Sequence, residues 1–154
     1  MSDSASVARR SGAQAAAVET VTEATRTVVL AYVAALNAHD PDAIAACVSD
    51  DFVSEHPSSL GRGRGLVGRA SYRERLPTFL AEFEDLHYEL EHVIVDGDLA
   101  ALAYRMTATW TGDRHARHAI DLRGVFRLRV RAGLVVERTD YWDSADFLQQ
   151  SGQR

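Results

Sequence analysis

The chain has 154 residues, of which 46% are hydrophobic, and it carries a formal net charge of −5 at pH 7. This length and composition fit one domain whose core needs no disulfide or metal to fold. The acidic balance argues against a nucleic-acid partner, because that binding depends on clustered Lys and Arg.

Membrane and metal partners are not expected either. No apolar run approaches the ~18 residues of a membrane helix, and no apolar segment follows Arg9 and Arg10 as it would in a secretory signal. The sequence therefore predicts a cytoplasmic protein. The single cysteine, Cys47, lies in an apolar run, and no metal-ligand spacing is present, so we expect no metal and no cofactor.

The N-terminal half is predicted to be helical. Residues 1–17 are rich in Ser and Ala without periodicity, so we expect a disordered tail, which leaves 18–154 as a single domain. Between Glu19 and Ala38 the apolar residues recur at helical spacing. A second helix is expected after Asp40, its N-cap, with Pro41 in the first turn.

A short strand then follows in "SDDFVSEHP" and ends on His56. The Gly-rich stretch 61–69 is expected to form a mobile lip over a pocket mouth. "RASYRERLPTFLAEF" is predicted to be a third helix that starts or kinks at Pro77.

The remaining sequence changes to a period of two. "HYELEHVIV", "LAALAYRMTATW", "HAIDLRGVFRLRV" and "LVVERTDYW" are predicted strands, and a short helix capped by Ser144 closes the chain. Helices first and a meander second predict an α+β fold: a cone-shaped, curved antiparallel sheet wrapped by N-terminal helices, a cystatin-like α+β barrel. Such a cone encloses a pocket wherever its side chains do not fill it.

Strand alternation predicts which side chains face that pocket. On the last strand Arg138, Asp140 and Trp142 share one face. A carboxylate beside a tryptophan on a concave face would be desolvated, which raises its pKa, whereas Arg138 would lower it. The alternative is a simple Arg138–Asp140 ion pair at the pocket rim.

Two further strands contribute apolar faces. One carries Tyr104, Met106 and Trp110, and the next carries Gly124 and Phe126. Such walls suit a flat hydrophobic ligand, or else they simply pack against the helices. The mid-strand Gly124 leaves room for a cavity or marks a bulge.

His56 is the candidate base at the pocket mouth. Pro57 restricts His56 to extended backbone, which fixes the direction of its side chain, and histidine titrates near neutral pH. The alternative is a solvent-exposed histidine at a strand end.

The order of elements from Glu19 to Gly152 resembles the nuclear transport factor 2-like superfamily. "YVAALNAHD" followed by "VSDDFVSEHP" resembles ketosteroid isomerase. "GVFRL" and "ERTDYWD" resemble limonene epoxide hydrolases, and "DYWDSADFLQQSG" is similar to the tail of SnoaL-like polyketide cyclases.

The isomerase resemblance implies roles for four residues. Tyr32 falls at the tyrosine that donates to the enolate oxygen, and His56 falls at the aspartate base. Gly124 replaces the second oxyanion donor, so that half of the oxyanion hole is missing, and Trp142 falls at an aromatic wall.

The epoxide hydrolases and cyclases bear on other positions. His56 falls at the asparagine with which the epoxide hydrolases hold their water. Tyr104 and Met106 replace the Arg and Asp of the hydrolase triad, and Asp140 matches its remaining carboxylate, with a similar carboxylate implicated in the cyclases.

These observations predict a cofactor-independent acid–base enzyme acting on a hydrophobic, carbonyl-bearing small molecule, polyketide- or terpenoid-like. His56 or Asp140 would abstract a proton and Tyr32 would stabilise the enolate, with cyclisation or isomerisation following. The alternatives are an epoxide hydrolase and a non-catalytic small-molecule-binding or accessory protein. The resemblance also implies a homodimer formed through the outer sheet face.

Overall fold

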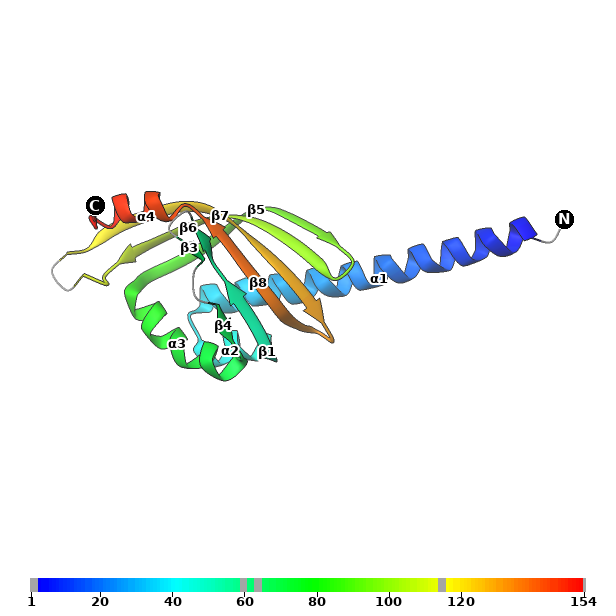
Figure 1. Cartoon of the computed structure of the whole chain (residues 1–154), viewed down its shortest axis with the longest axis horizontal. Coiled ribbons are helices and arrows are strands. Elements are labelled where there is room, and N and C mark those ends of the chain that lie inside the picture. Colours follow the sequence, from blue (N-terminus) through cyan, green and yellow to red (C-terminus); the bar gives the residue numbers. More distant parts are fainter. Residues whose placement is uncertain (1–2, 59–60, 63–64, 114–115, 154) are drawn as a thin grey trace.

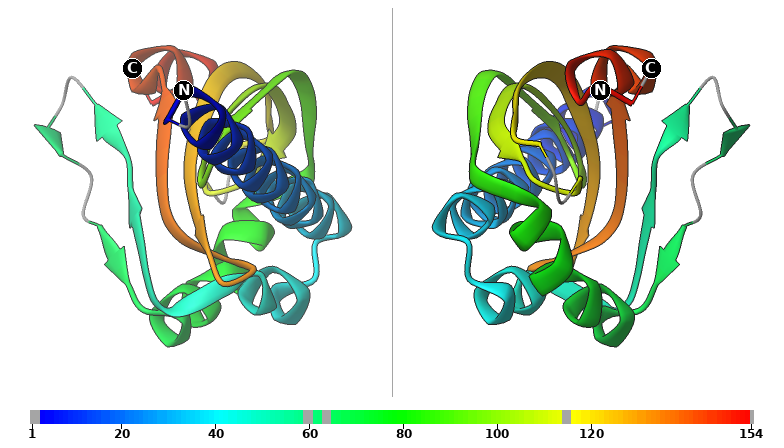
Figure 2. Two further views of the ribbon diagram at one scale, coloured as in Figure 1. Left: turned by 90° about the vertical axis from the view of Figure 1, so that its right-hand side faces the viewer. Right: turned by 90° about the vertical axis from the view of Figure 1, so that its left-hand side faces the viewer.

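The structure is a computed structural model that describes residues 3–58, 61–62, 65–113 and 116–153. The elements in chain order are α1 (Asp3–Ala38), α2 (Pro41–Ala46), β1 (Val48–Glu55), β2 (Pro57–Ser58), β3 (Gly61–Arg62), β4 (Leu66–Val67), α3 (Arg69–Glu82), β5 (Phe83–Asp96), β6 (Leu99–Trp110), β7 (His118–Arg131), β8 (Leu134–Trp142) and α4 (Ser144–Gln150). The sheet curves around α1 and α3, which lie on its concave side (Figures 1 and 2). The predicted α+β architecture is confirmed.

The main sheet has six strands in the order β4-β1-β8-β7-β6-β5. Strands β5 to β8 form the predicted antiparallel meander. Strand β1, however, pairs with β8 in parallel, with Ser54 opposite Arg138. The wholly antiparallel sheet of the prediction is therefore corrected at this one pair. No hairpin joins the two strands, so local turn chemistry does not fix their relative direction.

Helix α1 is longer than the sequence pattern indicates. It spans 36 residues and includes most of the segment expected to be a disordered tail. Residues 9–21 are exposed throughout, and this part of the helix projects beyond the sheet (Figure 1). The alanines of residues 13–17 favour helix strongly, and extending an existing helix avoids the cost of nucleation.

Helix α1 contacts the sheet side at Thr22, whose hydroxyl accepts a hydrogen bond from the N–H of Gly97 at 2.9 Å. Thr25 is buried, and the buried apolar residues Val29, Tyr32 and Leu36 follow at helical spacing. Among the residues that the structure describes, no helix is long and apolar enough to cross a membrane.

The helix caps match the predictions in one case and differ in another. Asp40 caps α2 as predicted, its Oδ1 accepting hydrogen bonds from the backbone N–H groups of Asp42 and Ala43 at 2.9 and 3.2 Å. Helix α4 is capped by Asp143 and not by Ser144, because the Asp143 carboxylate accepts from the N–H of Ala145 at 2.8 Å. The carboxylate is the stronger acceptor of the two neighbours.

Helix α3 continues through Pro77, which neither starts nor ends it. Its N-terminus follows Gly68, whose φ of 93° lies in the region that favours glycine. In the Gly-rich stretch 61–69, expected to be a mobile lip, residues 63–64 lie outside the described residues. Its described parts include β3, which pairs with β2, and β4, which pairs with β1.

Strands β6 and β8 begin and end where the alternating pattern predicts. Strand β5 starts earlier than predicted, at Phe83, because an irregularity between Glu84 and His87 lets it continue beyond the alternating segment. Asp85 has a φ of 54° within this irregularity.

Candidate active site

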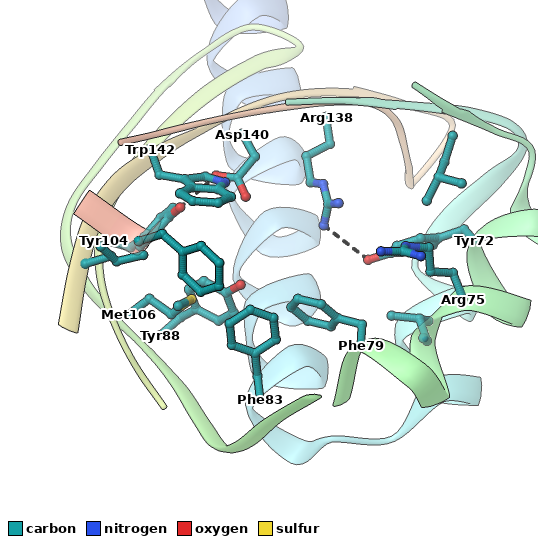
Figure 3. Close-up of a pocket in the computed structure, with 14 residues that line it drawn as sticks. Tyr72, Arg75, Phe79, Phe83, Tyr88, Tyr104, Met106, Arg138, Asp140 and Trp142 are labelled. Atoms are coloured by element: carbon teal, nitrogen blue, oxygen red, sulfur yellow. Dashed lines mark hydrogen bonds between the residues drawn. The ribbon is translucent and has the colours of Figure 1, made fainter. Parts of the chain in front are cut away.

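A cavity of about 120 Å³ lies between the concave face of the sheet and helix α3 (Figure 3). Half of its lining residues are wholly apolar: Leu66, Leu76, Phe79, Phe83, Met106, Leu122 and Phe147. The remaining lining residues carry polar atoms: Tyr72, Arg75, Tyr88, Tyr104, Arg138, Asp140 and Trp142. A mostly apolar cavity with a few convergent polar groups is typical of a small-molecule site.

Strand β8 supplies the polar wall of the cavity. Arg138, Asp140 and Trp142 alternate with outward-facing residues, and all three line the cavity as the period-two pattern predicts. Figure 3 shows them side by side above the aromatic rings of α3 and β5.

The Asp140 carboxylate is held by one oxygen only. Its Oδ1 accepts a hydrogen bond from the Tyr104 hydroxyl at 2.7 Å. Within the described part of the chain no hydrogen bond reaches Oδ2. Desolvation raises the pKa of Asp140 above its ordinary value, although Arg138, the Tyr104 hydrogen bond and His56 each act to lower it. Asp140 therefore has an open oxygen with raised basicity in an apolar cavity.

Arg138 is a cation bound by hydroxyl groups. It donates from Nε and Nη2 to Ser54 at 3.1 and 2.9 Å, and from Nη1 to Tyr32 at 2.7 Å and to Tyr72 at 3.3 Å. No carboxylate oxygen of the described residues lies within 4.0 Å of it, so the simple Arg138–Asp140 ion pair does not form. Because a guanidinium has five N–H groups and four contacts are made here, one N–H has no acceptor among the described residues.

Tyr32 lies behind the cavity wall. Its side chain is fully buried and does not line the cavity. Its hydroxyl lies 2.7 Å from the Tyr72 hydroxyl and accepts a hydrogen bond from Arg138. Tyr72, whose hydroxyl lies next to that of Tyr32, does line the cavity.

His56 follows the end of β1 and contacts two residues of β8. Its ring stacks on Trp142 with centroids 4.1 Å apart and an interplanar angle of 10°. Its Nδ1 lies 2.8 Å from the backbone carbonyl oxygen of Asp140. A carbonyl only accepts, so Nδ1 carries the hydrogen, and in the neutral ring Nε2 has a free lone pair. Nε2 is buried without a partner among the described residues.

His56 does not line the cavity that contains the Asp140 carboxylate. It borders a second groove, on the opposite face of β8, with Glu55, Arg127, Thr139 and Tyr141. The structure thus brings His56 and Asp140 together, but only Asp140 faces the apolar cavity.

The predicted wall residues separate into two groups. Trp142, Tyr104 and Met106 line the cavity. Trp110 and Phe126 are buried in the core and do not line it, Trp110 packing on Phe147 and Phe126 on Tyr104.

Gly124 also lies off the cavity, in an uninterrupted part of β7 and not at a bulge. The space beside it is taken by the Tyr104 ring.

Tyr72 and Tyr88 were not among the sequence-based candidates. The Tyr88 hydroxyl borders the cavity and has no hydrogen-bond partner in the described part of the chain. The Asn37 side chain fixes the Tyr88 backbone by donating to its carbonyl at 3.0 Å and accepting from its N–H at 2.8 Å. Alternation with Leu86 and Leu90 could have placed Tyr88 on the inner face.

No three His, Cys, Asp or Glu side chains of the described residues gather as metal ligands would. Among the described residues, the polar groups that line the cavity are one carboxylate, two guanidinium groups, three phenols and one indole N–H. Such a set can accept a proton, donate hydrogen bonds and stabilise negative charge.

The comparisons with known proteins agree with this fold. The family model of the SnoaL-like domain matches residues 29–138. No curated protein matches the sequence.

Three solved structures are similar. A ketosteroid isomerase-like protein of Catenulispora acidiphila, bound to trimethylamine, is 21% identical with a TM-score of 0.70, covering 81% of this chain and 92% of that one. A candidate ketosteroid isomerase of Kribbella flavida is 30% identical with a TM-score of 0.62, covering 79% and 78%. A candidate SnoaL-like polyketide cyclase of Shewanella denitrificans is 18% identical with a TM-score of 0.71, covering 84% and 98%. The chain belongs to the SnoaL-like domain family, within the nuclear transport factor 2-like superfamily.

Proposed function

We propose that this protein is a cofactor-independent acid–base enzyme that acts on a hydrophobic, carbonyl-bearing small molecule through an enolate. The observation that carries the proposal is the Asp140 carboxylate. One of its oxygens is held by Tyr104, and the other has no hydrogen-bond partner within the described part of the chain, in an apolar cavity that raises its pKa. A base whose pKa approaches the working pH is the more effective in proton transfer.

In the proposed reaction Asp140 Oδ2 takes a proton from a carbon next to the substrate carbonyl. The electron pair of the C–H bond forms a C=C bond, and the π pair of the C=O bond moves to the oxygen, which becomes the enolate oxygen. For isomerisation Asp140 returns the proton at another carbon. For ring closure the enolate carbon attacks a second carbonyl of the same molecule, and the resulting alkoxide takes the proton.

Three groups can stabilise the enolate oxygen. In the described part of the chain the Tyr88 hydroxyl has no hydrogen-bond partner and Arg138 has one N–H without an acceptor. Tyr72 borders the cavity beside Arg138. The charge arrangement favours this step, because the pair Arg138⁺ and Asp140⁻ becomes Arg138⁺ and enolate⁻. No net charge is created in the cavity.

The cavity also limits the enclosed part of the substrate. A cavity of about 150 Å³ binds benzene in another protein, and this one has about 120 Å³. We therefore expect one planar ring, or a chain folded to that size, to lie between Trp142 and the aromatic residues of α3. The similarity to isomerase-like and cyclase-like structures supports this class of substrate.

The epoxide hydrolase alternative gains no support from the geometry. Tyr104 and Met106 stand where the hydrolases carry their Arg and Asp, and His56 does not line the cavity. The other alternative is a protein that binds a small molecule without catalysis, and the experiment must distinguish this from enzymatic turnover.

The test is hydrogen–deuterium exchange at carbon, followed by proton NMR in D₂O with cyclic enones and 1,3-diketones as probes. The wild-type protein should accelerate exchange next to the carbonyl, His56→Ala should retain most of that rate, and Asp140→Asn should lose it. If the NMR signals of the probes shift on binding but no exchange is seen, the protein is a binding protein and not an enzyme. Loss of exchange in His56→Ala alone would make His56 the base.

A further inference from the structure

Tyr104 and Asp140 lie on strands that are not neighbours. Tyr104 is on β6 and Asp140 is on β8, with β7 between them. Adjacent strands are about 4.8 Å apart, so about 10 Å separates the two backbones. The Tyr104 hydroxyl nevertheless reaches Asp140 Oδ1 at 2.7 Å, which means that its ring crosses over β7.

The crossing point is Gly124. In the sheet register Tyr104 stands opposite Gly124, and Gly124 stands opposite Trp142 on the far side. A Cβ atom at residue 124 would overlap the Tyr104 hydroxyl, and it would lie 2.5 Å from the Tyr104 Cζ and 2.7 Å from the backbone oxygen of Tyr141. Any side chain at residue 124 therefore occupies the space through which the phenol reaches Asp140.

The contact has a consequence for the carboxylate. It holds Oδ1, so the rotation of the carboxyl group is fixed and Oδ2 is the oxygen that has no hydrogen-bond partner among the described residues. We propose that Gly124 and Tyr104 are positioning residues that act as one unit: the missing side chain at 124 admits the phenol, and the phenol fixes the orientation of Asp140. The importance of this orientation for catalysis rests on the proposed function, whereas the positioning itself does not.

Among the described residues, the charged and titratable groups around Asp140 and its cavity come from five elements. They are Arg138 on β8, His56 after β1, Tyr104 on β6, Tyr88 on β5, and Tyr72 and Arg75 on α3. Of these, Tyr104 alone makes a hydrogen bond to the Asp140 side chain among the described residues. Its removal is therefore expected to act on Asp140 directly.

The test is a pH titration of the Asp140 carboxyl carbon by NMR, with ¹³C-labelled aspartate and no substrate. Tyr104→Phe keeps the ring but removes the donor, and Gly124→Ala displaces the phenol. Each should shift the titration of Asp140 to higher pH, because a hydrogen bond to the ionised form is lost. The double variant should titrate like the single variants, because both remove the same contact.

Two matched controls make the same substitutions, Tyr to Phe and Gly to Ala, at positions away from Asp140. Tyr141→Phe alters an exposed tyrosine of the neighbouring outer face, and Gly12→Ala alters a glycine with no neighbouring atom within 4 Å. Both should leave the Asp140 titration at the wild-type position. An unchanged titration in Tyr104→Phe would overturn the proposal, as would additive shifts in the double variant. If Gly124→Ala does not fold, Tyr104→Phe still decides the question, since it removes a single oxygen.

Discussion

Replacing Asp140 by Asn should make the protein more stable at neutral pH. The pKa of Asp140 is raised in the folded state, chiefly by desolvation, and it returns to its ordinary value on unfolding. At a pH above the folded pKa, the folded state must keep an ionised carboxylate in an apolar cavity. Asn has nearly the same shape, still accepts from Tyr104, and carries no charge.

The sign and size of the effect follow from linkage. As the pH falls through the raised folded pKa toward the ordinary value, the native carboxyl takes up its proton first. The wild-type protein therefore gains stability relative to Asp140→Asn over that interval. Below both pKa values the two proteins should differ by less than about 0.5 kcal/mol. At neutral pH Asp140→Asn should be more stable by about 1.4 kcal/mol for each pKa unit of the rise.

The assay is urea unfolding of both proteins between pH 4.5 and 8. The free energies of unfolding are compared with the same m-value for both proteins. Asp51→Asn serves as the control of opposite sign. The exposed Asp51 accepts from Ser49, which lowers its pKa, so its replacement should lower stability at neutral pH and lose that effect in acid. A stability difference for Asp140→Asn that is negative at pH 8, or constant with pH, would refute the raised pKa and the desolvated carboxylate.

The remaining predictions concern the cavity wall and the outer sheet face. Tyr88→Phe should reduce carbon exchange by about 10²-fold or more, the usual loss for one oxyanion donor, and an unchanged rate would exclude Tyr88 from that role. Tyr32→Phe should affect exchange much less and instead lower the free energy of unfolding by about 1 kcal/mol, because the Tyr32 hydroxyl forms its hydrogen bonds with Tyr72 and Arg138 behind the cavity. Thermal unfolding and NMR exchange, measured on one sample, separate the two effects. Arg138→Met should move the Asp140 titration to higher pH, because Arg138 lowers that pKa, and a downward shift would contradict the assigned electrostatics. On the outer face Val125 and Tyr141 are 36% and 44% exposed. If these residues lie in the interface of the expected homodimer, Tyr141→Glu should halve the molar mass measured by light scattering. A monomeric wild-type protein would exclude that dimer.

The sequence was sufficient to predict β1, most of β5, the strands β6 to β8 and the inner face of β8, but not the short strands β2 to β4. Alternation alone placed Arg138, Asp140 and Trp142 together, because a strand that is buried on one face allows a single assignment of its side chains. Strand alternation could not distinguish residues that line the cavity from residues that are packed in the core, as Trp110 and Phe126 are. Both face inward, but which inward residues border an open space depends on how far the helices approach the sheet.

The missed residues depend on packing between distant elements. Tyr72 comes from α3, and it borders the cavity only because that helix packs beside Arg138. Tyr32 lies one layer further back, which motif similarity alone did not reveal. The role of Gly124 likewise requires the register of three strands, since Tyr104 and Asp140 meet only across β7.

The central claim is that Asp140 removes a proton from carbon. Its most direct test is the pH dependence of deuterium exchange into a cyclic 1,3-diketone, measured by NMR for wild-type protein and Asp140→Asn. The account predicts that the wild-type rate rises with pH along the titration of the Asp140 carboxyl carbon, and that Asp140→Asn lowers the plateau by about 10²- to 10⁴-fold. A rate that follows the same pH curve at the same height in Asp140→Asn would contradict it.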